Sequence, residues 1–334
     1  MTDFKIPNPL IINEKYLTKY FEHFDFLFKK KKDLRLLLAF SGGSDSILLL
    51  YLLLRYFKGN NRVINIAHIN HNLRNDSFKD EAFVTKVGLE LGINTYIRQL
   101  NPKLKSNDES IESWARKERY KSLSEILIES NSNIILTGHH KNDQVETILK
   151  NISEKTGLFG LGGMKSISKN LIRPLLPFTK IELMRIIDKY KIPYVDDSSN
   201  EELRFKRNFI RKKVLGPWVL NDNKVVDSIA ESAAYFSKYQ KSLIYFINEF
   251  IQNNVLQLQN GQVLIKKKHI EKLPSLAKVM VVQVLTNSLG QFRKHDFLDI
   301  KNFLQKNITG SIYNSRFKWC LLIDRKNFYL SKKG

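Results

Sequence analysis

Two short segments carry the residues whose types and spacing could do chemistry. The first is SGGSDS at positions 41–46. Its two glycines let the backbone turn sharply and approach a ligand, and loop amides ahead of a helix N-terminus form a natural anion site. The aspartate would repel a phosphate unless a Mg²⁺ ion lies between them. A plain Gly-Gly turn with a serine helix cap is the alternative. The candidate nucleotide-binding residues are Ser41, Gly42, Gly43, Ser44, Asp45 and Ser46.

The second segment is GHHKNDQVET at positions 138–147. Asp143 and Glu146 are three residues apart, so they point the same way at the start of a predicted helix, and His139 lies just before it. We expect Asp143 to contact a metal or an ammonium group, with Glu146 assisting. The alternative is acidic residues that only favour the helix dipole. His68 lies near the end of the predicted strand 62–70. It is a candidate for lining the nucleotide pocket, and the alternative is a hydrogen-bonded structural histidine.

The elements that must position these residues alternate along the first half of the chain. Residues 34–40 form a nearly continuous apolar run, typical of a strand buried on both faces. The pattern predicts further strands at 62–70, 93–100 and 133–137, and helices at 44–57, 77–91, 109–130 and 143–152. Strands separated by helices pair in parallel, so we expect an α/β fold with a doubly wound parallel sheet. Both segments then lie at the carboxyl ends of strands, where such folds bind ligands.

After this alternation the pattern changes. The glycine-rich residues 157–164 predict a loop, and a domain boundary is expected near Gly216. Domain one is then 1–215, and domain two is a mostly helical module with a small β tail at 216–334. Further expectations are a helix at 180–191, a loop at 194–200, a basic helix start at 207–213, one long helix or a pair at 222–254, helices at 277–289 and 297–305, and a β hairpin or meander at 310–331.

Composition restricts the class of protein. The 334 residues include 55 Lys and Arg against 33 Asp and Glu, a net charge of +22, which predicts a polyanionic partner such as nucleic acid. An ordinary solvated basic surface is the alternative. Cys320 is the only cysteine, so an internal disulfide and a cluster held by several cysteines of this chain are excluded. The apolar run ILLLYLLL is too short to span a bilayer, and the first ten residues hold no apolar signal core, so we expect a cytoplasmic protein away from membranes.

SGGSDS resembles the S-G-G-x-D-S signature of the N-type ATP pyrophosphatases of the PP-loop superfamily. Other segments resemble motifs of one branch, the tRNA(Ile)-lysidine synthase family. They are AHINHNLR at 67–74, WARKERY at 114–120, GHHKNDQVET and RPLL at 173–176. The resemblance is close over about residues 30–215.

The resemblance implies an adenine nucleotide α-hydrolase-like fold and the use of ATP and Mg²⁺. It implies transfer of AMP to the wobble cytidine of an isoleucine tRNA with a CAU anticodon. Free L-lysine then displaces AMP to give lysidine, which changes the specificity of the tRNA from methionine to isoleucine. Asp45, His139, Asp143 and Glu146 would be catalytic, and Asp45 and Asp143 would hold the metal. Residues 1–215 would be the catalytic domain and residues 216–334 a tRNA-binding region, and no obligate protein partner is expected.

Two departures from the family pattern and three alternatives stay open. Asn142 stands where the family usually has Asp, and Glu154-Lys155 stand where Arg-Gly is expected. A tRNA thiolase shares the adenylylation, although such enzymes generally hold sulfur on cysteines or an iron–sulfur cluster. A small-molecule synthetase would not need the strong positive charge. A catalytically inactive tRNA-binding protein is the remaining alternative.

Overall fold

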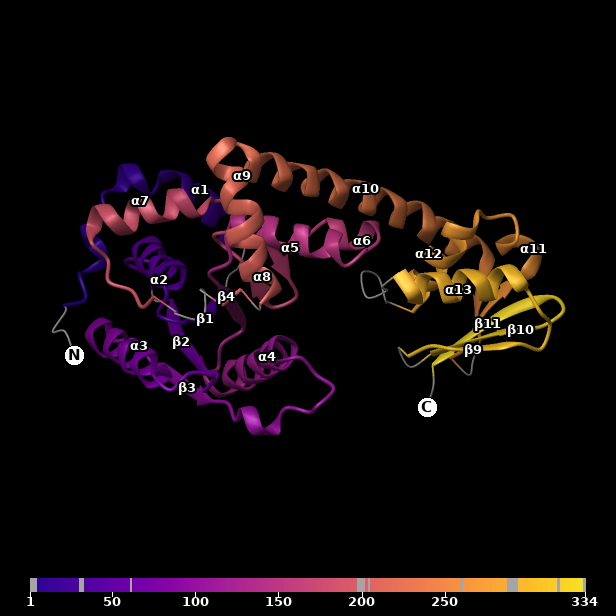
Figure 1. The fold of residues 1–334 in the computed structure, drawn as a ribbon, viewed down its shortest axis with the longest axis horizontal. Coiled ribbons are helices and arrows are strands. Elements are labelled where there is room, and N and C mark those ends of the chain that lie inside the picture. The colour runs from indigo at the N-terminus through magenta and orange to yellow at the C-terminus, as the bar shows by residue number, and fades with distance from the viewer. Residues whose placement is uncertain are drawn as a thin grey trace. The chain divides into compact units, whose positions relative to one another are not determined.

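The computed structural model describes residues 5–29, 33–60, 62–196, 202–203, 205–258, 261–286, 294–316 and 319–332. The chain divides into two compact units (Figure 1). The first is Met1–Glu146 with Met164–Asp227, and the second is Thr147–Gly163 with Ser228–Gly334. The expected functional domains, 1–215 and 216–334, stay a prediction. Gly216 itself begins a helix, because Pro217 occupies its first turn, where the missing N–H costs little.

The first unit contains a six-stranded sheet in the order β3-β2-β1-β4-β6-β5. Neighbours from β3 to β6 pair in parallel, and β5 is antiparallel to β6. The strands are β1 (Arg35–Ala39), β2 (Val63–Asn70), β3 (Thr95–Gln99), β4 (Ile134–Thr137), β5 (Ile167–Ser168) and β6 (Leu171–Ile172). The predicted doubly wound α/β fold is confirmed. Strand order reverses between β1 and β4, so the crevice at their carboxyl ends is the expected ligand position.

Helices cover both faces of this sheet because β1 is apolar on both sides. Leu36 and Leu38 pack in one core with residues of α1, α2, α3 and α7, whereas Leu37 packs with Leu123 and Ile126 of α4. The helices of this unit are α1 (Thr18–Phe28), α2 (Ser44–Tyr56), α3 (Ser77–Leu91), α4 (Ile111–Glu129), α5 (Lys141–Ser153), which ends in the second unit, α7 (Lys180–Tyr190), α8 (Lys206–Phe209), a π-helix (Ile210–Leu215) and α9 (Gly216–Asn221), with short 3₁₀ turns at Pro9–Ile11, Glu14–Tyr16 and Pro102–Leu104.

The second unit packs helices on an antiparallel sheet of order β7-β8-β11-β10-β9. Its strands are β7 (Val255–Gln257), β8 (Val263–Lys266), β9 (Ile312–Asn314), β10 (Trp319–Ile323) and β11 (Asn327–Lys332). Its helices are α6 (Leu158–Leu161), α10 (Val225–Asn254), which starts in the first unit, α11 (Lys267–Ile270), α12 (Ser275–Leu285) and α13 (Lys294–Lys306).

Three expectations change here. The predicted loop at 157–164 is wrong at its centre, because α6 forms there and Phe159 packs on the core of the second unit. The segment 222–254 is a single helix from Val225. The sheet of the expected β tail also contains the β7–β8 hairpin. The sequence did not predict this hairpin, because its strands are only three and four residues long. The ends of the expected elements 194–200 and 277–289 lie outside the described residues.

No helix in the described ranges combines the length and the apolar character that crossing a membrane requires.

Candidate functional site

A cleft of about 1170 Å³ opens at the carboxyl ends of β1, β2 and β4. The loops that follow these three strands form its walls, together with the start of α7 and the segment that leads into α9. The cleft brings together nearly all of the residues singled out by the sequence. Those that line it are Ser41, Gly43, Ser44, Asp45, Ser46, His68, His139, Asp143 and Glu146.

The loop after β1 has the shape that an anion site requires. Gly42 has φ +83°, and a Cβ there would lie 3.0 Å from the ring of Phe83, so both conformation and space require glycine. Gly43 is the N-cap residue of α2, and its carbonyl accepts from the Ser46 and Ile47 amides at 3.1 and 3.0 Å. The helix N-terminus therefore opens into the cleft with its positive dipole end.

Asp45 is held by two basic groups from other elements. Its Oδ1 accepts from Lys180 Nζ at 2.7 Å, and its Oδ2 lies 3.6 Å from His140 Nε2. Lys180 Nζ also donates to Ser44 Oγ at 2.6 Å. Burial alone would raise the pKa of Asp45, but the hydrogen bond and charge of His140 and the charge of Lys180 lower it below its usual range. The carboxylate is thus ionised in the cleft.

Asp143 and Glu146 form a buried network with two arginines. Arg207 donates to Asp143 Oδ1 and to Glu146 Oε2, each at 2.7 Å. Arg211 Nε donates to Glu146 Oε1 at 2.6 Å. Glu146 is only 1% exposed. Despite burial, the pKa of Asp143 lies well below its ordinary value because His140 and Arg207 stabilise the carboxylate. The pair at positions 207 and 211 therefore faces the acids rather than solvent.

Four histidines line the cleft, and three of them, His68, His139 and His140, have shifted pKa values. His139 is half-buried, and its loss of solvation lowers its pKa to about 3, so the ring is neutral; its Nδ1 lies 2.8 Å from Thr137 Oγ1. Burial also lowers the pKa of His68, whose Nδ1 lies 3.0 Å from the Phe40 carbonyl. His140 is the exception. Burial would lower the pKa of His140, but Asp143 and Asp45 raise it. The His140 Nε2 lies 3.6 Å from a carboxylate oxygen of each.

Sequence reasoning did not single out three functional candidates, although two of them, His140 and Arg119, lie inside the motifs GHHKNDQVET and WARKERY. The sequence analysis chose His139 instead of its neighbour His140, because only the fold shows which of the two rings lies next to the carboxylates. Lys180 comes from a helix 135 positions away, and the Thr179 capping box that starts α7 sets its place. Arg119 lines the cleft, whereas Arg116, three positions earlier on α4, is exposed.

The first departure from the family pattern has a structural explanation. Asn142 Oδ1 accepts from the Lys180 amide at 2.9 Å, which anchors α7 beside the cleft. A carboxylate would accept the same hydrogen bond, so asparagine keeps the acceptor and loses only the charge. The second departure lies in the second unit, where Lys155 has φ +55°. Glycine adopts that conformation without strain, which is consistent with the expected Arg-Gly.

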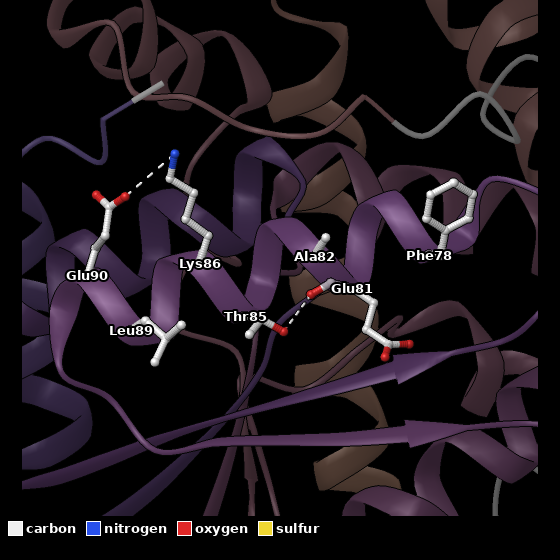
Figure 2. A pocket seen from close by; sticks show the side chains of 7 residues that line it. All are labelled: Phe78, Glu81, Ala82, Thr85, Lys86, Leu89 and Glu90. Carbon is white, nitrogen blue, oxygen red and sulfur yellow. Dashed lines mark hydrogen bonds and ion pairs between the residues drawn. The ribbon is translucent and has the colours of Figure 1, made fainter. Parts of the chain in front are cut away.

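A smaller hollow of about 560 Å³ lies along α3 (Figure 2). All of its lining residues come from this one helix, and its lysine, Lys86, is 3.7 Å from Glu90. Such a hollow offers no convergent groups from different elements. The cleft at the strand ends is therefore the candidate site.

Comparison with known proteins agrees with this placement. Residues 16–217 match the model of the PP-loop domain family. The tRNA(Ile)-lysidine synthase of Thermosipho africanus is 38% identical over 211 residues, which cover 62% of this chain and 48% of that protein. The tRNA(Ile)-lysidine synthase of Clostridioides difficile is 32% identical over 311 residues, which cover 90% of this chain and 65% of that protein. The chain thus spans between about half and two thirds of the length of these relatives.

A solved structure shows the same fold at low sequence identity. The U34-tRNA thiolase from Methanococcus maripaludis, determined with its 4Fe-4S cluster, superposes with a TM-score of 0.56 at 19% identity, over 66% of this chain and 79% of that one. The likeness concerns the fold alone. The family match covers the parallel sheet, the glycine loop after β1 and the cleft above them, and by this match the chain belongs to the PP-loop domain family.

Proposed function

We propose that this chain ligates L-lysine to the wobble cytidine of an isoleucine tRNA with a CAU anticodon. The cytosine ring oxygen attacks the α-phosphorus of ATP and pyrophosphate leaves. The lysine ε-amine then attacks the ring carbon, and AMP departs with that oxygen. The product is lysidine, and the specificity of the tRNA changes from methionine to isoleucine. The curated relatives that carry the name tRNA(Ile)-lysidine synthase support this proposal.

The observation that carries the proposal is that one cleft contains both an anion-binding loop and a second group of charged residues. The glycine loop offers amides and hydroxyls for an anion, and the Asp143–Glu146 network lies opposite the same opening. A phosphate-binding loop alone would suit any nucleotide-binding protein. A second set of fixed charges is what a reaction with an acceptor and an amine requires.

The residues present fit ATP and Mg²⁺. The carboxylates of Asp45 and Asp143 approach one imidazole from two sides, and together with the loop hydroxyls they form a set of oxygen donors of the kind Mg²⁺ prefers. Among the described residues, no group of three or more His, Cys, Asp or Glu side chains is arranged to hold a metal ion by itself. Mg²⁺, when bound, would stabilise the charge of the departing pyrophosphate.

The basic groups of the cleft have distinct proposed tasks. Lys180 bridges Asp45 and Ser44, so its ammonium stands next to the phosphate loop. Arg207 and Arg211 hold Asp143 and Glu146 in place, and Glu146 is the proposed positioning residue because it is the more deeply buried of the two acids. Arg119, whose Nε has no hydrogen-bond partner within the described structure, is the candidate cation for the lysine α-carboxylate.

The lysine ε-amine must lose a proton before it attacks. His139 is a poor base with a pKa of about 3, so its proposed role is a neutral hydrogen-bonding contact. Asp143, which accepts from Arg207 and lies 3.6 Å from His140 Nε2, is the proposed contact for the lysine ammonium or the metal. We place the enzyme in the cytoplasm, where tRNA and ATP are found. The net charge of +22 supports a tRNA partner.

One assay tests the proposal. Purified protein is incubated with ATP, Mg²⁺, an isoleucine tRNA with a CAU anticodon and lysine, and AMP release is measured as each component is omitted. We expect release that requires both tRNA and lysine. Release with tRNA and a sulfur donor but without lysine would favour the thiolase. Tight tRNA binding without release would indicate an inactive binding protein, and release with neither tRNA nor lysine would indicate a small-molecule synthetase.

A further inference from the structure

The five-stranded sheet of the second unit has two faces of different character. One face is covered by α12 and α13 and supplies core residues such as Ile265, Phe328 and Leu321 (Figure 1). Side chains alternate across a strand, so their neighbours point the other way. We call that opposite side the outward face.

An apolar row crosses the outward face from edge to edge. The strand register pairs these residues in sequence, each directly opposite the next, so their side chains touch across the strands. At the edges Leu256 and Ile312 are 55% and 57% exposed. None of the five belongs to the core that the described residues of this unit form. The row is Leu256, Leu264, Tyr329, Leu322 and Ile312.

The centre of this row is an aromatic ring with a fixed position. Tyr329 lies on the middle strand, between Leu264 and Leu322. Asn327 Nδ2 donates to the Tyr329 hydroxyl at 3.2 Å. A ring tethered at its hydroxyl on a strand loses little entropy when a flat ligand stacks on it.

One end of the outward face is basic. Lys266 pairs with Asn327 across the strands, and the Lys267 amide donates to the Lys326 carbonyl at 2.8 Å, which brings the two strand ends together. Lys266, Arg325 and Lys326 are exposed there. Asp324 is the acidic residue of this turn. Its Oδ1 accepts from the Lys326 and Asn327 amides at 2.6 and 2.5 Å, so this carboxylate stabilises the turn itself.

This combination selects the class of occupant. An apolar row alone would match a second protein, but the three exposed cations beside the middle of this row complement a polyanion. Unpaired RNA bases stack on exposed aromatic rings of sheets, while cations hold the adjoining phosphates. We propose that the outward face binds unpaired nucleotides of the tRNA, with one base stacked on Tyr329 and the backbone held by Lys266, Arg325 and Lys326. This inference rests on the proposed tRNA partner and assigns it a surface.

The experiment uses the full chain with fluorescein-labelled RNA, either a single-stranded heptamer or a duplex of equal length, and follows anisotropy. Tyr329→Phe keeps the ring and should bind the single strand within about twofold of the unsubstituted chain. Tyr329→Leu keeps apolar bulk and should weaken it about tenfold or more, since base stacking is worth about 1–3 kcal/mol. Duplex binding should not change. Equal single-strand affinity in Tyr329→Leu, or equal loss for both RNAs, would overturn the proposal.

A second pair of variants tests the basic end without touching the row. Lys266→Gln with Lys326→Gln should flatten the plot of log affinity against log salt by about 1.4, since single strands lose about 0.7 per phosphate contact. Lys306→Gln, on the helix layer of the opposite side, is the matched control and should keep the slope. An unchanged slope in the double variant would contradict the proposal even if Tyr329→Leu did not fold.

Two further readouts distinguish RNA binding from self-association and from catalysis. Sedimentation shows whether a second copy occupies the face: a dimer that Tyr329→Leu dissociates, with RNA binding intact, would overturn the RNA proposal. AMP release tests the proposed function independently. An unsubstituted chain that binds single strands through Tyr329 but releases no AMP would refute the ligase and leave the RNA surface standing.

Discussion

The glycine loop and the Asp143–Glu146 network, the two sides of the cleft, hold their charged groups in place in different ways. On the loop side, glycines and hydroxyls expose backbone amides, and the one acidic group, Asp45, is 29% exposed and held by Lys180 and His140. On the opposite side, Asp143 and Glu146 are buried and bound by two arginines. The groups of the loop side reach solvent, so a bound ligand can replace their present hydrogen-bond partners. The buried side cannot lose a charge without leaving another unpaired, so it serves position as well as chemistry.

Substitution on the loop side should separate activity from stability. Asp45→Asn removes a proposed metal-binding charge and little volume, so ATP–pyrophosphate exchange with tRNA should fall by about 100-fold or more, while the thermal midpoint shifts little. The matched control is Asp188→Asn, an exposed acid on α7 that should keep full exchange. Near-normal exchange in Asp45→Asn would refute the metal role.

Substitution on the buried side should affect both properties. Asp143→Asn keeps the shape but leaves Arg207 short of a counter-charge, which should cost about 3 kcal/mol of unfolding free energy and cripple the reaction. The measurements are chemical denaturation and separate assays of the two half-reactions. Accumulation of adenylylated tRNA would assign Asp143 to lysine, and loss of the first half-reaction would assign it to the metal. Two normal half-reactions would refute both roles.

The neutral His139 should give the buried side a distinctive pH dependence. Its folded pKa of about 3 lies below the unfolded value of about 6.5, so only the unfolded chain takes up this proton between these values. Stability contributed by the neutral ring is therefore present above pH 6.5 and is lost as pH falls toward 3, with a slope of at most about 1.4 kcal/mol per pH unit. His139→Asn should remove one proton from this slope in denaturation curves at several pH values. An unchanged slope would contradict a neutral ring.

A small gain is expected where the chain departs from its family. Lys155 adopts φ +55° at the end of α5, where an L-residue pays a conformational cost. Lys155→Gly should raise the unfolding free energy by about 1 kcal/mol. Lys150→Gly, inside the same helix, should lower it by about the same amount. A loss of stability in Lys155→Gly would mean that the lysine side chain contributes more than the strain costs.

The smallest effect is expected at the only cysteine. Cys320 lies on β10, with its Sγ 3.0 Å from Ser331 Oγ, in the unit that does not contain the cleft. Cys320→Ser should leave AMP release unchanged. Loss of activity in a normally folded Cys320→Ser protein would instead favour a sulfur-transfer enzyme.

Local sequence sufficed for the four parallel strands β1 to β4 and for the phosphate loop. Buried strands in such sheets are continuous apolar runs, and the loop lies wholly within six neighbouring residues, so no distant information was needed. Spacing along the chain also indicated that Asp143 and Glu146 point the same way, whereas their expected chemistry came from the family resemblance and stays a prediction. The short strands β5, β6, β7 and β8 were missed, because two to four residues carry too little periodicity to identify a strand.

Tertiary structure decided which partners these residues have. Lys180 reaches Asp45 across 135 positions, and Arg207 reaches Asp143 across 64, so no local pattern predicts either contact. The choice between His139 and His140 rests on which ring lies between two carboxylates, since adjacent residues share the same sequence environment but point in different directions. The outward row around Tyr329 exists only through strand register, which pairs residues that hydrophobic patterning alone does not connect. Sequence determined the elements and the kinds of groups at their ends, and packing determined which charges meet, because electrostatic coupling depends on distance in space and on burial.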